Sequence, residues 1–374
     1  MQRMLCKIAK WAGLIAAGLF ALYLLAATAL ALAPSPKLIH PNRASHSEPR
    51  GLGGLCRASA GIRCFPMRDD ALLAARQLGP LPVNQDGLIV VLLHGIMSSS
   101  GELAETARGL RETTGATVVR LDLRGHGGSA GKPGDIDHIG QWEEDLADVV
   151  SALRKESPGA RIVLAGHSMG AGIEMRYALR HKERHDVPDV DGYLLFAPHF
   201  GYESPTTRKE PAADPKLAKS EASAPPPIIR MNVPRLIGLA LLNVLGIAQL
   251  NGLDTLFFDL PVDLPFRAYS YRAVVSMAPD DYRPALAADA KPMLVLVGEN
   301  DEAFIASEYP AAVAFHPNSK TVIVPNETHD GIFRNPAAFV AIHDWIGSVS
   351  PATSVTTGPL RSARIEAPIV PAKK

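Results

Sequence analysis

The chain has 374 residues, which exceeds one average domain, so we expect one large domain with an insertion or appendage. The formal net charge is zero and no Lys/Arg-rich run occurs, which argues against a nucleic-acid partner. Its three cysteines form no Cys-x-x-Cys pair, and no His-Glu-x-x-His motif occurs, so neither a structural zinc nor a metal hydrolase is indicated. We expect no metal and no cofactor.

An uncharged, almost wholly apolar segment spans Trp11 to Ala33, and as a helix it would be about 34 Å long, enough to cross a bilayer. Three basic residues precede it: Arg3, Lys7 and Lys10. A cleaved signal peptide is one explanation, but the best cleavage site, Ala31-Leu32-Ala33, would leave Pro34 first. We therefore favour an uncleaved anchor over residues 1–33.

The basic N-terminus favours a membrane-anchored protein, of the bacterial inner-membrane type, with the rest of the chain on the non-cytoplasmic side. Basic residues beyond the apolar segment weaken this bias, and a secreted protein is the alternative; they are Lys37, Arg43, Arg50 and Arg57. Residues 34–64 are predicted to be a tether. Within it, Cys56 and Cys64 could form a disulfide in an oxidising compartment.

The first buried strand is predicted over Leu88 to Leu93, after a stretch, Asp70 to Arg76, whose composition favours a helix. The strand ends in His94-Gly95-Ile96, where a glycine lets the backbone approach a substrate. The amide of Ile96 is then a candidate oxyanion donor, and His94 is expected to brace the loop.

Alternating strands and helices follow. A strand is predicted over Thr117 to Leu121, and it leads into a glycine-rich loop, 122–129, that holds Arg124 and His126. Helical spacing marks Glu102–Thr113 and Trp142–Leu153, with Trp142 in the core. Short apolar strands joined by helices predict a mostly parallel sheet covered on both faces.

Gly166-His167-Ser168-Met169-Gly170 follows the apolar run 162–165 and precedes the helix formers of 171–180. A serine with glycines two positions away, between a strand and a helix, is typical of a nucleophile elbow. Gly166 and Gly170 would permit the sharp reversal, Ser168 would be the nucleophile, and the amide of Met169 would be the second oxyanion donor.

The regular alternation of predicted strands and helices ends near Pro198. Residues 203–227 suggest a mobile loop, and residues 228–258 are strongly apolar. Pro234 is expected to open a helix that carries apolar residues as far as Leu250. The apolar side of this insertion could form an acyl-chain pocket, face a membrane, or simply pack on the main domain.

Two later strands end in candidate catalytic residues. The strand 293–297 leads into a loop with three carboxylates, of which Asp301 is the best placed; Glu299 and Glu302 fit an exposed acidic loop. The strand 321–325 leads to His329, a candidate general base. Other histidines fit less well, because they precede the strand or lie on helices: His316, His343, His181 and His185. The helix 336–346 follows, and the tail 349–374 is predicted to be disordered.

The order Ser168, Asp301, His329, with each residue just past a strand, resembles the α/β-hydrolase family rather than the serine proteases. The loop 122–129 is similar to that of the monoacylglycerol lipase, lysophospholipase and serine aminopeptidase branch. The resemblance implies an opening antiparallel hairpin over residues 65–78 and gives Arg124 and His126 a structural role. It also implies a core over 65–198 and 272–348, with a helical cap inserted at 199–271.

These observations predict a serine hydrolase that cleaves carboxylic esters, a lipase, lysophospholipase or carboxylesterase, with an acyl ester or lipid as substrate. A serine aminopeptidase is the alternative, and it would need acidic residues in the cap; the candidates are Glu203, Glu210, Asp214 and Glu221. A non-catalytic, membrane-anchored binding protein is the second alternative. Aspartate-nucleophile relatives are disfavoured because the elbow holds serine, whereas perhydrolases and cofactor-free oxygenases stay open.

Overall fold

The structure is a computed structural model that describes residues 2–40, 56, 61–82, 87–209 and 228–349. An eight-stranded sheet forms its centre, in the order β1-β2-β4-β3-β5-β6-β10-β11. The strands are β1 (Arg63–Pro66), β2 (Leu72–Leu78), β3 (Leu88–Leu93), β4 (Thr117–Leu121), β5 (Arg161–His167), β6 (Gly192–Phe196), β10 (Met293–Gly298) and β11 (Ser319–Val324).

From β4 to β11 the neighbouring strands pair in parallel, and only β1 and β2 are antiparallel to their neighbours. Every residue of β3, β6 and β10 is buried, because helices cover both faces of the sheet. Since parallel strands all end at the same edge, the loops after β3, β5, β10 and β11 meet there. The predicted α/β-hydrolase architecture is confirmed.

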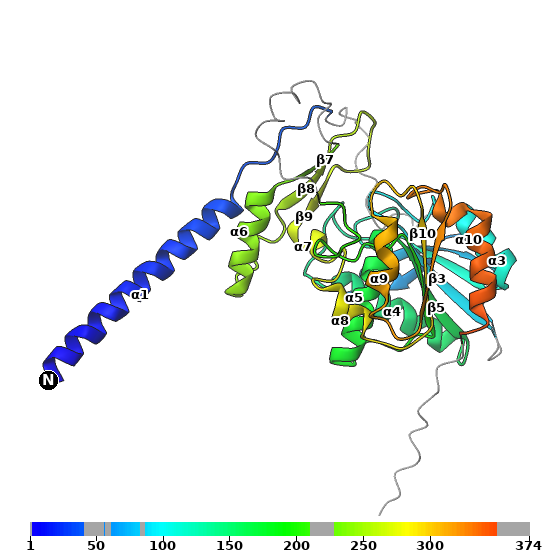
Figure 1. The fold of residues 1–374 in the computed structure, drawn as a ribbon, viewed down its shortest axis with the longest axis horizontal. Helices are drawn as coiled ribbons and strands as arrows, with labels where there is room; N and C mark the ends of the chain where they lie inside the picture. The colour runs from blue at the N-terminus through cyan, green and yellow to red at the C-terminus, as the bar shows by residue number, and fades with distance from the viewer. Residues whose placement is uncertain (1, 41–55, 57–60, 83–86, 210–227, 350–374) are drawn as a thin grey trace, which may run out of the picture.

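Helices lie on both faces of this sheet, with α3 packed against α10 on one side and α4 and α5 on the other (Figure 1). Trp142 in α4 is fully buried, as the helical spacing predicted. The helices and short 3₁₀ turns of this part are α3 (Ala104–Thr114), α4 (Gln141–Glu156), α5 (Met169–Arg184), α8 (Tyr282–Leu286), η2 (Ala306–Glu308), α9 (Tyr309–Val313), η3 (Ile332–Arg334) and α10 (Pro336–Ile346).

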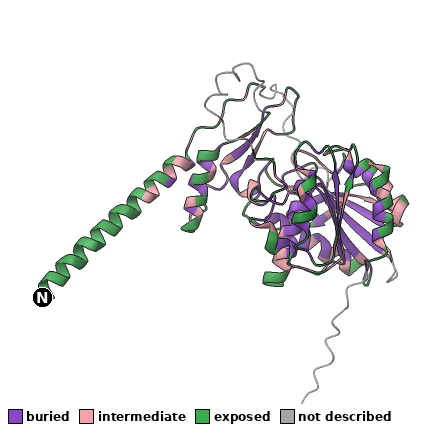
Figure 2. Ribbon diagram, viewed as in Figure 1, coloured by how far each residue is buried: buried purple, intermediate pink, exposed green. Residues whose placement is uncertain are grey.

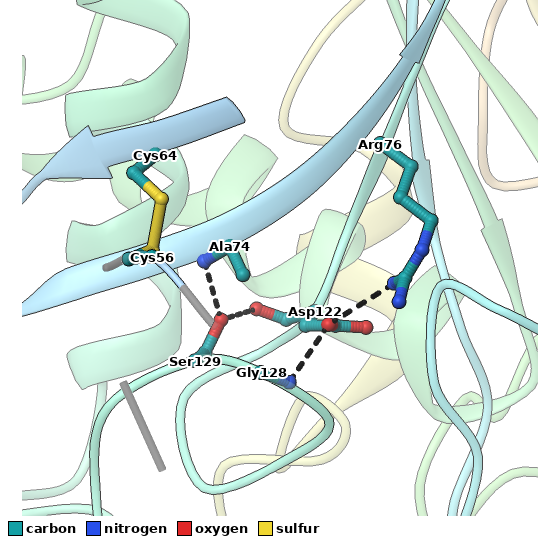
Figure 3. The surroundings of a disulfide bond; sticks show 7 residues. All are labelled: Cys56, Cys64, Ala74, Arg76, Asp122, Gly128 and Ser129. Carbon is teal, nitrogen blue, oxygen red and sulfur yellow. Dashed lines mark hydrogen bonds and ion pairs between the residues drawn. A yellow bond between two sulfur atoms is a disulfide. The ribbon is translucent and has the colours of Figure 1, made fainter. Parts of the chain in front are cut away.

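The opening hairpin is present. Strands β1 and β2 pair antiparallel, so the helix that composition favours over Asp70 to Arg76 does not form. In β2 the side chains of Leu73 and Ala75 are buried in the main core. The backbone of β2 pairs with β4 as well as with β1. A disulfide joins Cys64 of β1 to Cys56 (Figure 3). This cross-link ties the predicted tether to the edge of the sheet.

The insertion between β6 and β10 contains a helix, α6 (Val233–Val244), and a three-stranded antiparallel sheet. The strands are β7 (Ile229–Met231), β8 (Asp254–Phe258) and β9 (Ala268–Ser270), and a short helix, α7 (Tyr271–Val274), follows. The expectation of a helical cap did not include this sheet. The expectation that the helix reaches Leu250 was also wrong: α6 ends at Val244, and Gly246 has a positive φ of 74° that breaks the helical course.

The N-terminal helix, α1 (Gln2–Ala31), leaves the body of the protein and is exposed along most of its length (Figure 2). Its stretch Arg3–Ala31 is the one helix of the described residues that is long and apolar enough to cross a membrane. Its C-terminal end lies beside α6 (Figure 1).

Three predictions concern residues outside the described part of the chain. The disordered tail falls on residues 350–374, most of the predicted tether on residues 41–55 and 57–60, and most of the predicted mobile loop on residues 210–227.

Candidate active site

Ser168 lies at the junction of β5 and α5, with φ 53° and ψ −112°, a region that residues with a side chain seldom adopt. The two flanking glycines allow the close approach that this turn needs. A Cβ at Gly166 would lie 2.6 Å from the amide nitrogen of Ala171, and one at Gly170 would lie 2.8 Å from the carbonyl oxygen of His94. Ser168 is therefore held in a strained turn at a helix N-terminus, where negative charge is favoured.

Asp301 and His329 come together above the ends of β10 and β11. Asp301 Oδ2 accepts a hydrogen bond from Nδ1 of His329 at 2.8 Å. The other carboxylate oxygen, Oδ1, accepts from the amides of Ala303 and Phe304 at 2.8 and 2.7 Å, which fixes the carboxylate plane. Because an ionised carboxylate only accepts, His329 carries its proton on Nδ1, and its Nε2 is left as a base.

His167 connects this pair to the elbow, and no catalytic role was predicted for it from the sequence. Its Nε2 donates to the backbone carbonyl of His329 at 3.1 Å, and the two rings lie 4.7 Å apart. Burial, together with the neighbouring His329, lowers the pKa of His167 well below its ordinary value, so the ring is neutral. The only sequence signal was its place between Gly166 and Ser168.

Among the described residues, no hydrogen bond joins Ser168 Oγ to His329. The two residues approach each other through His167, which precedes the serine and holds the histidine backbone. Hydrogen bonds between a nucleophile and its base are commonly long without substrate and shorten in the substrate complex. The arrangement thus brings the Asp301–His329 pair close to the elbow.

The loop after β3 lies directly against the elbow, since a Cβ at Gly95 would be 3.5 Å from Cβ of Ser168. His94 is fully buried there; its Nδ1 donates to the carbonyl of Gly95 at 2.8 Å, and its Nε2 accepts from the amide of Leu123 at 3.2 Å. Because the peptide bond is planar and trans, fixing the Gly95 carbonyl also fixes the direction of the Ile96 amide. His94 thus orients the first predicted oxyanion donor.

Tyr269 of β9 is a second residue that sequence reasoning missed. Its hydroxyl accepts from the amide of Met97 at 2.8 Å and lies 2.8 Å from Nε2 of His126. His126 Nδ1 faces the carbonyl of Arg124, so Nδ1 is the protonated nitrogen and Tyr269 donates to Nε2. Burial lowers the pKa of His126 to about 3, which agrees with a neutral ring. Tyr269 therefore links the insertion to the loop that holds Ile96.

The loop 122–129 is held by its own side chains and by the opening hairpin (Figure 3). Asp122 accepts from the amides of Ser100 and Gly128 at 2.6 and 2.9 Å, and Ser129 accepts from the amide of Ala74 at 2.8 Å. Arg124, almost fully buried, forms ion pairs with Asp145 at 2.6 Å and Asp69 at 2.9 Å. These contacts agree with a structural role for Arg124.

The two rival carboxylates brace the histidine loop rather than lying free. Glu302 accepts from the amide of His329 at 3.0 Å, and Glu299 accepts from the amide of Asn326 at 2.9 Å. The rival histidines make contacts elsewhere: His316 accepts from the Asn318 amide, and His343 on α10 lies beside Asp344. His181 and His185 lie together at the C-terminal end of α5.

One group within the described residues has the spacing of metal ligands, since donor atoms of His167, His329 and Asp330 lie within 4.8 Å of one another. Both histidines already use a nitrogen in the contacts above, His167 Nε2 with the His329 carbonyl and His329 Nδ1 with Asp301. If His167 held a metal through Nε2, the nitrogen that lies 3.8 Å from Asp330 Oδ1, it would lose its hydrogen bond to the His329 carbonyl. The donor set therefore fits proton transfer better than metal binding.

Comparison with known proteins finds similar sequences and a similar fold. A family profile described as serine aminopeptidase, S33, matches residues 85–227. The monoacylglycerol lipase of Mycolicibacterium smegmatis is 31% identical over 104 residues, which cover 28% of this chain and 37% of that protein. A monoglyceride lipase homolog of Monkeypox virus is 33% identical over 94 residues, covering 25% of this chain and 34% of the relative. The chain thus spans about a third of the length of these curated relatives.

The solved structure of Est1E from Butyrivibrio proteoclasticus with bound ferulic acid covers 76% of this chain and 98% of its own, with a TM-score of 0.52 and 19% identity. At that identity the likeness concerns the fold alone. Taken with the strand order, it shows that the chain has the α/β-hydrolase fold, and the sequence relatives show that part of the chain is similar to monoacylglycerol lipases.

Proposed function

We propose that this protein is a membrane-anchored serine hydrolase that cleaves carboxylic esters of acyl or lipid substrates. The observation that carries the proposal is the strained Ser168 at the elbow beside an Asp301–His329 pair whose Nε2 is free to act as a base. Similarity to monoacylglycerol lipases supports a lipid ester as the substrate class.

In the proposed mechanism, Nε2 of His329 takes the proton of Ser168 as Oγ attacks the ester carbonyl. Asp301 keeps the histidine in the correct tautomer and stabilises the imidazolium that forms. The amides of Ile96 and Met169 hold the oxyanion; removing one such donor typically costs about 100- to 1000-fold in rate. The protonated His329 then releases the alcohol, and water hydrolyses the acyl-enzyme by the same steps.

The test is labelling and turnover of the full-length protein in detergent. A fluorophosphonate probe should label wild type and Ser348→Ala, a matched change on the surface after α10, but not Ser168→Ala. Turnover of a p-nitrophenyl ester should fall about a million-fold in Ser168→Ala. Labelling that persists in Ser168→Ala would contradict the assignment. Failure to label wild type would favour the binding-protein alternative.

The match to a family described as serine aminopeptidase favours one second candidate, hydrolysis of an amide. Of the acidic residues that would capture a substrate amine, Glu203 is exposed and pairs with Lys209, while the other three lie outside the described residues. Comparing p-nitrophenyl esters of graded chain length with aminoacyl p-nitroanilides separates the two activities. We expect the esters to be cleaved at least 100-fold faster.

We further propose that α1 anchors the protein and that the catalytic part lies on the non-cytoplasmic side. The basic residues in the N-terminal part of α1 support this orientation, and the Cys56–Cys64 disulfide suits an oxidising compartment. Protease protection in intact cells or spheroplasts tests it: on this proposal, added protease digests the catalytic part without lysis.

A further inference from the structure

Helix α6 of the insertion runs antiparallel to the C-terminal half of α1. The hydroxyl of Tyr23 donates to the carbonyl of Leu241 at 2.8 Å, and Asn232 Nδ2 donates to the carbonyl of Pro34 at 2.9 Å. Between these contacts Arg235 donates to the carbonyl of Ala33. As residue numbers fall along α1 they rise along α6, so α6 returns beside the apolar helix, toward its N-terminus (Figure 1).

The interface between the two helices is built from small residues. Ala27 and Ala31 of α1 are fully buried, and a Cβ at Gly238 of α6 would lie only 2.6 Å from the carbonyl oxygen of Ala27. Leu239 and Leu242 fill the space around them. Small residues that allow backbones to approach closely are typical of helix pairs inside membranes.

The outer face of α6 is apolar and unpartnered. Ile237 and Val244 are 45% and 79% exposed, and Leu245 in the following turn is 38% exposed. Between Val233 and Leu250 there is no acidic residue and no lysine, and the single arginine, Arg235, lies at the start of the helix. Helix α6 is thus an apolar helix too short to cross a bilayer, aligned with one that is long enough.

Several polar groups at the far end of α6 are satisfied within the protein, as a membrane interior favours. The side chains of Asn243 and Asn251 bond to each other at 2.7 and 2.9 Å, and Asn243 also donates to the carbonyl of Leu239 at 2.7 Å. The amides of residues 245–247 donate to carbonyls of the last helical turn. This helix end therefore needs few hydrogen bonds from water.

Charged and polar contacts gather instead at the opposite end of the helix pair. Asp259 accepts from the amides of Ile39 and His40 at 2.9 and 2.7 Å and pairs with Arg230 at 2.8 Å. Arg235 bonds there to Ser35 at 3.1 Å. Polar and charged groups of this kind suit the level of a membrane surface. From it, the 12 residues of α6 would extend about 18 Å, a little over half of a hydrocarbon core of about 30 Å.

We propose that α6 and the turn after it, residues 233–250, insert into the half of the bilayer nearest the catalytic part, with lipid acyl chains covering the outer face of α6. The inference rests on the proposed anchor but not on the chemistry at Ser168. It follows that α1 must be retained in the mature protein for α6 to insert into the bilayer. Cleavage after Ala33 would remove Ala27 and Ala31 and expose Leu239 and Leu242.

The test measures the depth of single fluorescent probes in full-length protein reconstituted into phosphatidylcholine vesicles. An environment-sensitive nitrobenzoxadiazole label is attached to Val244→Cys or Val233→Cys in a Cys6→Ser background. The matched control is Val340→Cys, because Val340 is also an exposed valine, 63% exposed, but lies on α10 of the core. Intact mass spectrometry of the same samples shows whether residues 1–33 are present.

We expect the Val244 probe to be blue-shifted, shielded from iodide and quenched most strongly by lipid spin-labelled deep in the acyl chain. The Val233 probe should be quenched most strongly by label near the headgroup, and the Val340 probe by iodide alone. A Val244 probe as accessible to iodide as the Val340 probe would overturn the inference. A mature chain that lacks residues 1–33 would overturn the anchor with it.

These outcomes are separate from hydrolysis. The depths should be the same when Ser168→Ala is added, and ester turnover of the labelled proteins is measured in parallel. Loss of activity with correct depths would count against the catalytic proposal alone, and correct activity with a water-exposed Val244 probe against the insertion alone.

Discussion

The loops around Ser168 and the helix pair α1–α6 are held by different kinds of contact. Around the serine, buried neutral histidines bond to backbone groups: His94 to Gly95 and Leu123, His126 to Arg124, and His167 to His329. Between the helices, small and aliphatic residues carry most of the contact, and the charged groups lie at one end. The histidine contacts fix the orientation of the backbone groups around Ser168, whereas the apolar interface between the helices suits the interior of a membrane.

Among the changes that compare these two regions, the largest effect is expected at Asp301, the carboxylate proposed to orient the base. In Asp301→Asn the amides of Ala303 and Phe304 still require an oxygen at the Oδ1 position, so the new amide group must face His329. His329 would then carry its proton on Nε2 and could no longer act as a base. We expect kcat for a p-nitrophenyl ester to fall about 10,000-fold, with binding of a non-hydrolysable analogue little changed.

Glu299→Gln makes the same chemical change in the same loop and serves as the control. Its side-chain oxygen can still accept from the Asn326 amide, so kcat should stay within about tenfold of wild type. Equal losses in the two variants would mean that the loop, and not the tautomer of His329, had been disturbed.

Lowering the pH should destabilise the loops around Ser168 before it destabilises the helix pair α1–α6. The folded protein holds His126 neutral with a pKa of about 3, against 6.5 for an ordinary histidine. Between these values the unfolded chain binds the proton and the folded chain does not, so stability falls as the pH falls through this window. We expect His126 alone to cost about 3 kcal/mol at pH 4.5 relative to pH 7.

Hydrogen exchange in detergent at the two pH values, corrected for intrinsic exchange rates, measures this difference. Amides of the loops 94–97 and 122–129 should lose protection at pH 4.5, while those of α6 keep theirs. His343→Gln, which removes an exposed histidine, should leave the pattern unchanged. Equal loss of protection in α6 would remove the contrast between the two regions.

A side chain at Gly238 should break the helix pair without touching the site. In Gly238→Leu the added atoms would collide with the backbone of α1 at Ala27 and Ala31, at a cost of about 1–3 kcal/mol. We expect faster hydrogen exchange in α6 but turnover of a short soluble ester within about threefold of wild type. Gly347→Leu is the control, because no atom lies within 4 Å of a Cβ at that position.

The smallest effect is expected at Tyr269, which links β9 of the insertion to the loop that holds Ile96. Tyr269→Phe removes the acceptor for the Met97 amide and the donor to His126, and so loosens the loop that holds Ile96. A lost hydrogen bond of about 1 kcal/mol corresponds to roughly a fivefold lower kcat, with KM little changed. Tyr177→Phe is the control, since its hydroxyl bonds to Pro188, and an equal loss there would indicate a general destabilisation.

Much of the core could be predicted from the sequence because its signals are local. The strands at Leu88–Leu93 and Thr117–Leu121 and the helix at Pro336–Ile346 form with the predicted ends, since apolar runs and glycine or proline boundaries specify them. Because the strand ends could be predicted locally, Ser168, Asp301 and His329 could also be predicted to lie just past them. That the last two meet depends on all parallel strands ending at one edge of the sheet.

Only the tertiary structure decided the rest, because those choices depend on partners distant in the chain. Composition favours a helix at Asp70–Arg76, yet pairing with β1 and β4 makes it a strand. Nothing local to Tyr269 or His167 indicates that they hold the loop with Ile96 and the backbone of His329. The apolar composition of α1 and α6 could be read from the sequence. Their antiparallel pairing depends on contact between Gly238 and Ala27, about two hundred residues apart in the chain.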